Sequence, residues 1–156
     1  MSEQQKVTID QAREAVRQLC AKGDFDGANH LIDQMRVQAP ENPYVLDMWG
    51  SVASMQGRYA DAVEALSRLD ALIQPIMSVK SKLAFALRQL ERLDDSIAVL
   101  EGAQAAFPTD RDVQAELGLL LIYAGRFADA ETVLKAAGNH PRAAGFLPLA
   151  AKLAAG

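Results

Sequence analysis

The sequence has almost no cysteine and few aromatic residues. Cys20 is the single cysteine in 156 residues, and aromatic side chains make up 6%. One cysteine excludes an internal disulfide framework and a cysteine-rich zinc site. The two histidines, His30 and His140, have no His, Cys or carboxylate partner at zinc-ligand spacing in the sequence. We therefore expect neither a metal site nor any other cofactor.

Long apolar runs and an excess of positive charge are also missing. The longest apolar stretch is GLLLIYAG, which is far shorter than a membrane-spanning helix of about 18 residues. Sixteen Lys and Arg against twenty Asp and Glu give a net charge of −4, which argues against non-specific nucleic-acid binding. The opening residues MSEQQKVT lack the basic-then-apolar pattern of a signal peptide. With 50% hydrophobic residues, we expect a soluble, cytoplasmic protein with one packed core and no membrane insertion.

What the sequence does contain is an internal repeat of 34 residues. Gly23 and Gly57 lie 34 residues apart, and Gly125 follows Gly57 after 68, which is twice 34. Each glycine is followed two residues on by an aromatic residue, and three residues later by alanine, in the segments GDFDGA, GRYADA and GRFADA. The third slot of the same frame holds Glu91 instead of glycine. Prolines recur with spacings of 35, 33 and 33, at Pro40, Pro75, Pro108 and Pro141.

The chemistry of the repeat predicts a helix, a short turn and a second helix. Glycine after a helix adopts the left-handed conformation without a Cβ penalty, and the prolines end the second helices. Thr8, Asn42 with Pro43, and the segment Thr109–Asp112 look like helix starts. We therefore expect a lead of residues 1–8, four hairpins over 9–42, 43–76, 77–110 and 111–144, and a short capping helix in 145–156 that begins near Pro148.

This pattern resembles the tetratricopeptide-repeat (TPR) family over residues 9–144. The family has large, small and aromatic residues at fixed places, and the second and fourth frames match them best. These matches are Leu46, Trp49, Gly50, Tyr59, Ala62 and Leu66, then Leu117, Gly118, Phe127, Ala130, Leu134 and Ala137. The first frame is weaker at its start, and the third frame is the most divergent. The resemblance implies an all-α fold, an α-solenoid of about four stacked hairpins, with a concave groove lined by the first helix of each.

The groove face of each first helix carries the candidate partner-binding residues. Helix geometry puts places two, five, nine and twelve of each frame on the stripe opposite the packing face. That stripe and its flanks give Arg13, Arg17, Tyr44, Met48, Met55, Phe85, Arg88, Leu119, Ile122 and Tyr123. Arg13 and Arg17 predict a basic end, and the listed residues other than the arginines predict a more apolar middle and far end. Because Met and aromatic residues at helical spacing are often core, burial within the monomer is the alternative for each of them.

The fourth frame contains the segment AELGLLLIYAG, which is apolar nearly all round. Such a helix needs a second partner surface, which could be a client peptide, a second subunit or the chain's own tail. The first hypothesis for function is a protein-interaction module, an adaptor or chaperone that binds a peptide or helical segment of another protein. In length, charge and groove character the chain resembles bacterial type III secretion chaperones. The alternative hypothesis is a structural subunit that assembles with itself as a homodimer.

No motif in the sequence predicts catalysis. Cys20 has no histidine near it in sequence, the glycines are single and follow the 34-residue period, and Asp94 and Asp95 are adjacent and so point in different directions on a helix. The chaperone-type clamp for two carboxylates is also incomplete, because the places of its asparagines hold Arg17 and Met48. We therefore expect a protein that is not an enzyme.

Overall fold

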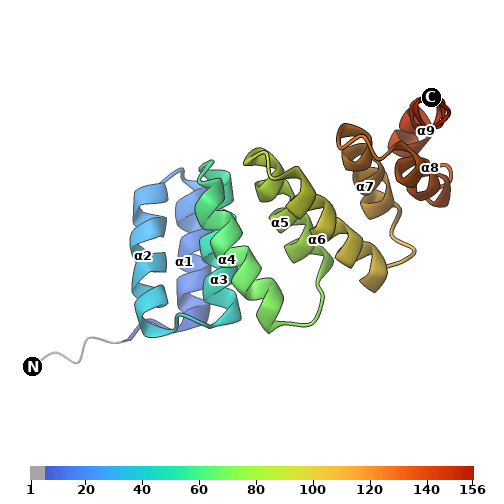
Figure 1. Ribbon diagram of the computed structural model, residues 1–156. Coiled ribbons are helices and arrows are strands. Elements are labelled where there is room, and N and C mark those ends of the chain that lie inside the picture. Colours follow the sequence, from blue (N-terminus) through green and yellow to red (C-terminus); the bar gives the residue numbers. More distant parts are fainter. Residues whose placement is uncertain (1–5) are drawn as a thin grey trace, which may run out of the picture. The chain divides into compact units, whose positions relative to one another are not determined.

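The computed structural model describes residues 6–156, and these residues form nine α-helices and no strand (Figure 1). The all-α fold predicted from the sequence is confirmed. The chain divides into two compact units, unit 1 ending at Gln74 and unit 2 spanning Pro75–Gly156. Each unit is built from helical hairpins in which consecutive helices pack against one another.

Unit 1 contains two hairpins. Its helices are α1 (Ile9–Ala21), α2 (Phe25–Gln38), α3 (Pro43–Met55) and α4 (Tyr59–Leu72). Helix α3 packs against α4, α1 packs against α2, and α3 also contacts both helices of the first hairpin. The first helices α1 and α3 thus lie next to each other, which is the arrangement that a shared binding face requires.

Unit 2 contains two hairpins and one further helix. Its helices are α5 (Met77–Gln89), α6 (Leu93–Ala106), α7 (Arg111–Tyr123), α8 (Phe127–Ala136) and α9 (Pro141–Ala154). Helix α6 packs against α5 and α7, and α9 packs against both α7 and α8. One continuous cluster of buried side chains, drawn from all five helices, forms the core of this unit.

Three helices start where the sequence predicts. Thr8 precedes α1 in a capping box, with its hydroxyl accepting from the Gln11 N–H and the Gln11 side chain accepting from the Thr8 N–H. The Asn42 side chain caps α3, whose first residue is Pro43. Asp110 caps α7 by accepting from the Val113 N–H at 3.0 Å.

The turn inside each hairpin has one recurring geometry. Gly23, Gly57 and Gly125 have φ of 75°, 72° and 75°, and Glu91 takes the same left-handed conformation at 59°. In every copy the N–H of the next residue donates to the carbonyl five residues earlier, at 2.8 to 3.0 Å. This bond closes the end of the first helix. The third repeat therefore keeps the turn although it has lost the glycine.

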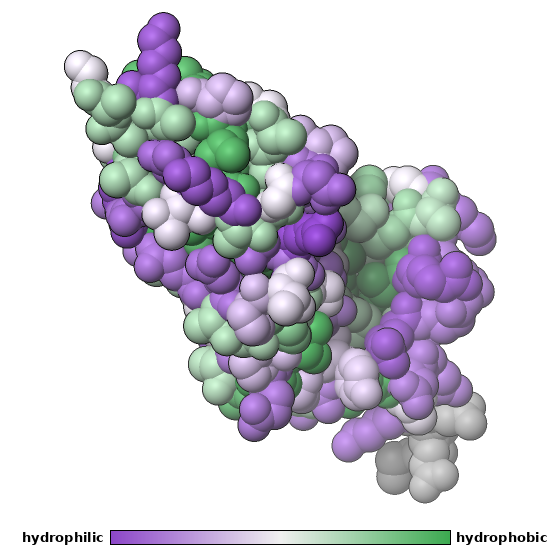
Figure 2. All heavy atoms as spheres, turned by 90° about the vertical axis from the view of Figure 1, so that its right-hand side faces the viewer, coloured by the Kyte–Doolittle hydropathy of each residue, from purple (hydrophilic) through white to green (hydrophobic). Residues whose placement is uncertain are grey.

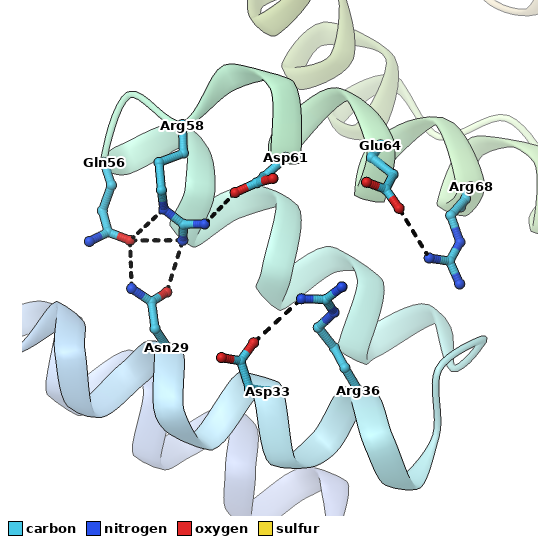
Figure 3. Close-up of polar contacts among 8 residues, drawn as sticks. All are labelled: Asn29, Asp33, Arg36, Gln56, Arg58, Asp61, Glu64 and Arg68. Carbon is cyan, nitrogen blue, oxygen red and sulfur yellow. Dashed lines mark hydrogen bonds and ion pairs between the residues drawn. The ribbon is translucent and has the colours of Figure 1, made fainter.

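The two hairpins of unit 1 are joined by polar contacts as well as by core packing (Figure 3). The Asn29 amide of α2 donates to Gln56 at 2.9 Å, and Arg58 donates to Asn29, Gln56 and Asp61. The Arg36 guanidinium lies 3.5 Å from the ring centroid of Trp49, a buried residue of α3. These contacts fix α2 against α3 and α4.

The carboxy-terminal helix is longer than predicted. The capping helix was expected to begin near Pro148, but α9 begins at Pro141 and contains Pro148 in its interior. Proline at the first position of a helix needs no N–H partner, so Pro141 starts α9 directly after His140. Pro148 has no N–H for the carbonyl of Ala144, yet α9 continues to Ala154, with Ala143 and Ala150 fully buried on its inner face.

Candidate functional site

A pocket of about 460 Å³ lies between the two first helices of unit 1. It is lined by residues of α1 and α3 only: Arg13, Val16, Arg17, Cys20, Ala21, Asp47, Met48, Ser51, Val52 and Met55. Four of the ten predicted groove residues are among them. The face of the first helices that the sequence singled out is therefore hollowed in this unit, and its lining is mostly apolar.

The predicted basic end of this pocket is balanced by acidic residues of the same helix. Arg17 donates twice to the Glu14 carboxylate, at 3.0 and 2.6 Å. These bonds, with a further one from Gln18, lower the pKa of Glu14 from 4.5 to about 2. Arg13 lies 3.7 Å from Asp10. The sequence showed the positive charges at groove positions, but helical spacing of three residues pairs each arginine with an acid.

The apolar and aromatic residues of this pocket differ in exposure. Met55 is 61% exposed, whereas Met48 is 8% exposed and contributes to the core while its surface lines the pocket. Tyr44 does not line the pocket; it is 52% exposed, and the guanidinium of Arg13, which does line the pocket, lies over its ring at 4.3 Å from the centroid. Partial burial raises the pKa of the Cys20 thiol, which disfavours the nucleophilic thiolate form.

A second pocket, of about 470 Å³, lies in unit 2 between α5 and α7. Phe85 and Arg88, both predicted groove residues, line it from α5, and Asp112 and Glu116 line it from α7. Arg142, at the start of α9, completes the wall. Phe85 is 47% exposed, so it presents an aromatic surface beside these charged groups.

Glu116 is the centre of the charged groups in this second pocket. Arg88 donates to its Oε1 at 2.7 Å, and Arg142 donates to its Oε2 at 2.8 Å. Asp112 lies 2.8 Å from Nε2 of His140. Sequence reasoning missed Glu116 and Arg142, because Glu116 does not fall on the predicted stripe of places two, five, nine and twelve and Arg142 lies beyond the predicted first helices.

The last three predicted groove residues lie on α7 and have different surroundings. Leu119 is 8% exposed, and Ile122 packs against the core cluster of unit 2. Phe146 and Leu147 of α9 pack against the same cluster. The chain's own tail therefore packs on the core to which the fourth frame contributes, and the burial of Leu119 and the packing of Ile122 place both in the interior rather than on an open surface. Tyr123 remains 66% exposed.

Some apolar surface remains exposed near the carboxy-terminal end. Leu149 and Leu153 of α9 are 44% and 38% exposed. Figure 2 views the molecule from the side of α8 and α9, and hydrophobic atoms lie among hydrophilic ones on the face toward the viewer. The tail thus covers part of the fourth frame and leaves apolar side chains of its own accessible.

Two features that the described residues lack bear on the kind of site. Residues 6–156 contain no group of three His, Cys, Asp or Glu side chains placed to hold a metal ion. In the same range, no helix has both the length and the apolar character needed to cross a bilayer. The two pockets described above are lined mainly by the first helices of the hairpins, the faces that the sequence singled out.

Comparison with known proteins finds similarity in structure only. No family model and no curated protein sequence matches the chain. Among solved structures, a crystal structure of MamA superposes with a TM-score of 0.84 at 22% identity, covering 94% of this chain and 82% of that one. A structure described as YrrB, a TPR protein with an unusual peptide-binding site, gives a TM-score of 0.76 at 15% identity, covering 89% and 72%.

These similarities show the fold. The chain has the α-solenoid fold of TPR proteins, as the repeat predicted. At 15% to 22% identity they do not carry over the partner of either protein, so function has to be argued from the pockets themselves.

Proposed function

We propose that this chain is a protein-interaction module that binds a peptide or helical segment of a partner protein on the open faces of its first helices. The observation that supports the proposal is that each unit has a pocket lined by these helices, and that exposed residues at the predicted places line both. In unit 1 these are Arg13, Arg17 and Met55, and in unit 2 they are Phe85 and Arg88.

The composition of the pockets suits a polypeptide better than a metabolite. The unit 1 pocket is open and mostly apolar, with Met48 and Met55 providing adaptable contact surface. The unit 2 pocket adds an aromatic ring, Phe85, and arginines, which are residue types that often dominate binding energy in interfaces. The peptide-binding site named for YrrB is consistent with this use of the fold.

Catalysis is not part of the proposal. The acidic groups Glu116 and Asp112 of the unit 2 pocket are engaged, Glu116 with two arginines and Asp112 with His140, and burial raises the pKa of the Cys20 thiol of unit 1. A role as a chaperone, including a type III secretion chaperone, is a more specific form of the same proposal and stays a prediction.

The test is a set of single substitutions read out by partner capture. Immobilised wild-type protein, Met55→Ala, Phe85→Ala and the control Val37→Ala are each incubated with lysate, and bound proteins are quantified by mass spectrometry. Val37 of α2 is 85% exposed and lies outside both pockets described above, so it controls for the loss of an exposed apolar side chain. Circular dichroism melts should be nearly unchanged for all three variants.

The expected result is a partner that binds the wild type and Val37→Ala but is depleted about tenfold or more on Met55→Ala or Phe85→Ala, as for an interface anchor. A partner set that is equally retained by all four proteins would contradict the proposal. Unfolding of Met55→Ala and Phe85→Ala would show instead that these side chains belong to the core.

Self-assembly is the second candidate function, and the exposed Leu149 and Leu153 of α9 favour it. If α9 joins two copies, light scattering should give the mass of a homodimer for the wild type and of a monomer for the Leu149→Ser, Leu153→Ser double variant. These exposed positions are better targets than removal of the tail, because Ala143 and Ala150 of α9 are fully buried. A wild type that is still monomeric at about 100 micromolar, where even a weak dimer would be populated, would count against self-assembly.

A further inference from the structure

Helix α9 packs in unit 2 as the first helix of a hairpin does, although no second helix follows it within residues 6–156. It begins with a proline, as α3 does, and it packs against α7 and α8. Counted from the first residue of each helix, places 3 and 10 are buried in α3, α5, α7 and α9 alike. These residues are Val45 and Val52, Val79 and Ala86, Val113 and Leu120, and Ala143 and Ala150. Helix α9 therefore has the register of a first helix.

In the complete hairpins, places 8 and 11 of the first helix lie against the second helix. A Cβ at Gly50, place 8 of α3, would lie 2.7 Å from Cγ of Leu66 in α4. A Cβ at Gly118, place 8 of α7, would lie 2.4 Å from a methyl carbon of Leu134 in α8. Place 11 follows on the same face and is buried in α3, α5 and α7, as Ala53, Leu87 and Leu121. The second helix thus covers a continuous stripe of the first.

In α9 the corresponding stripe is apolar and open. Ala144 at place 4 and Pro148 at place 8 are exposed, and Ala151 at place 11 is half-buried. Ala155, four residues further on, is exposed as well. These four residues, called the α9 stripe below, include no polar side chain, so solvent meets an apolar helix face there.

Helix α1 shows how this chain builds a helix face that solvent covers. No described helix precedes α1, and its places 3 and 10, which are buried in the other first helices, are the exposed Gln11 and Gln18. A polar outer face of this kind is what a terminal repeat needs in water. The α9 stripe lacks it, and this contrast indicates that a further element covers the stripe.

We propose that the α9 stripe docks an amphipathic α-helix of another protein, which takes the place of a second helix. The second helices of this chain give the chemistry of that helix. Each carries a small residue, a leucine four residues later and an apolar residue three residues after that. All are buried: Ala62, Leu66 and Leu69 in α4, Ser96, Leu100 and Ala103 in α6, and Ala130, Leu134 and Ala137 in α8 and its C-cap.

The charge at this end of the chain favours a partner helix with an acidic residue beside the apolar pattern. Residues 141–156 contain Arg142 and Lys152 and no Asp or Glu. Arg142 pairs with Glu116, whereas Lys152, at place 12 beside the stripe, has no ion pair with a described residue. A symmetric contact between the stripes of two copies would bring both Lys152 side chains together without an acid and would place small residues against small residues. An acidic partner helix with a leucine avoids both.

The experiment titrates a helical peptide against the full chain by fluorescence anisotropy. The probe is a labelled peptide with the α4 sequence YADAVEALSRLDAL, held helical by a cross-link between the exposed places of Ser67 and Ala71. A copy with the Leu66→Asp change is the control peptide. The protein variants are Ala144→Glu, in the stripe, and Leu153→Glu, whose place 13 lies on the other side of α9.

We expect the peptide to bind the wild type and Leu153→Glu equally, and to bind Ala144→Glu at least about tenfold more weakly, because the new carboxylate would be buried under the peptide. The Leu66→Asp peptide should lose affinity to a similar extent. Melting curves are compared first, and if Ala144→Glu melts early, Ala155→Glu at the end of the stripe replaces it.

Equal binding to the wild type and Ala144→Glu, or no saturable binding up to about 1 millimolar, would overturn the inference. A wild type that is dimeric in light scattering and becomes monomeric on Ala144→Glu would show that a second copy is the occupant. The stripe residues line neither pocket described above, so this inference goes beyond the proposed function and does not rest on it. Loss of peptide binding on Phe85→Ala or Met55→Ala instead would place the peptide in the first-helix pockets, which overturns the stripe and leaves the proposed function standing.

Discussion

Glu91→Gly should make the protein more stable, although it introduces the most flexible residue. Glu91 closes the turn between α5 and α6 with φ of 59°, in the conformation that Gly23, Gly57 and Gly125 adopt in the other three turns. A left-handed conformation costs an L-residue about 1–2 kcal/mol, which glycine avoids. Glycine loses about 0.5–1 kcal/mol more chain entropy on folding than a residue such as alanine. The difference predicts a net stabilisation of about 0.5–1 kcal/mol.

Urea unfolding followed by circular dichroism measures this difference, with two controls. Glu91→Ala removes the carboxylate but keeps the strain, so it should leave the free energy of unfolding nearly unchanged. Gly23→Ala is the mirror experiment, because Gly23 has φ of 75° and a Cβ there would meet no heavy atom within 4 Å. It should lose about 1 kcal/mol through backbone strain alone.

Tryptophan fluorescence, recorded in the same urea titration, reports on the unfolding of unit 1 alone. Trp49 is the single tryptophan of the chain and belongs to unit 1, whereas Glu91 belongs to unit 2. If the units unfold separately, Glu91→Gly shifts the circular dichroism curve and leaves the fluorescence curve in place. The reasoning would be refuted if Glu91→Gly were no more stable than Glu91→Ala while Gly23→Ala lost stability as expected.

Further predictions concern helix packing and the charges of α1. Gly118→Ala should destabilise the protein by about 1–3 kcal/mol in thermal melts, because its Cβ would lie 2.4 Å from a methyl carbon of Leu134. Gly145→Ala, inside α9 with no heavy atom within 4 Å of the new Cβ, should instead gain about 0.5–1 kcal/mol. In an NMR titration the Glu14 carboxyl should titrate near pH 2, and Arg17→Gln should return its pKa toward 4.5. Any stability from this ion pair is present above about pH 4.5, is lost as the pH falls toward 2, and is small because the groups are exposed.

The hairpins could be predicted from the sequence because their determinants are local. A capping side chain, a proline at a first helical position and a left-handed residue after a helix act within a few residues of one another, as Thr8, Pro43 and Gly57 show. Even Glu91 follows the rule, since the 34-residue frame predicts the turn where the glycine is missing. Local chemistry was insufficient for α9, where the residues before Pro148 continue the helix because α7 and α8 bury one side of it.

The exposure of the predicted groove residues depended on contacts that periodicity does not contain. Phe85 and Leu119 occupy equivalent places in the third and fourth frames, yet Phe85 is 47% exposed and Leu119 is 8% exposed. Helix α9 packs against α7, and its Phe146 and Leu147 join the core cluster of unit 2. The same stripe position is therefore surface in one repeat and core in another, according to what the rest of the chain places beside it.

The ion pairs between helices follow a spacing that the repeat itself could have suggested. Arg88 contacts Glu116 and Asp112 contacts His140, each 28 residues further on, and Glu116 contacts Arg142 after 26. These separations are six to eight residues short of the 34-residue period, which corresponds to an offset of about 9–12 Å along helices that lie side by side. Opposite charges that lie 26 to 28 residues apart in a 34-residue helical repeat are therefore candidates for an ion pair between neighbouring hairpins.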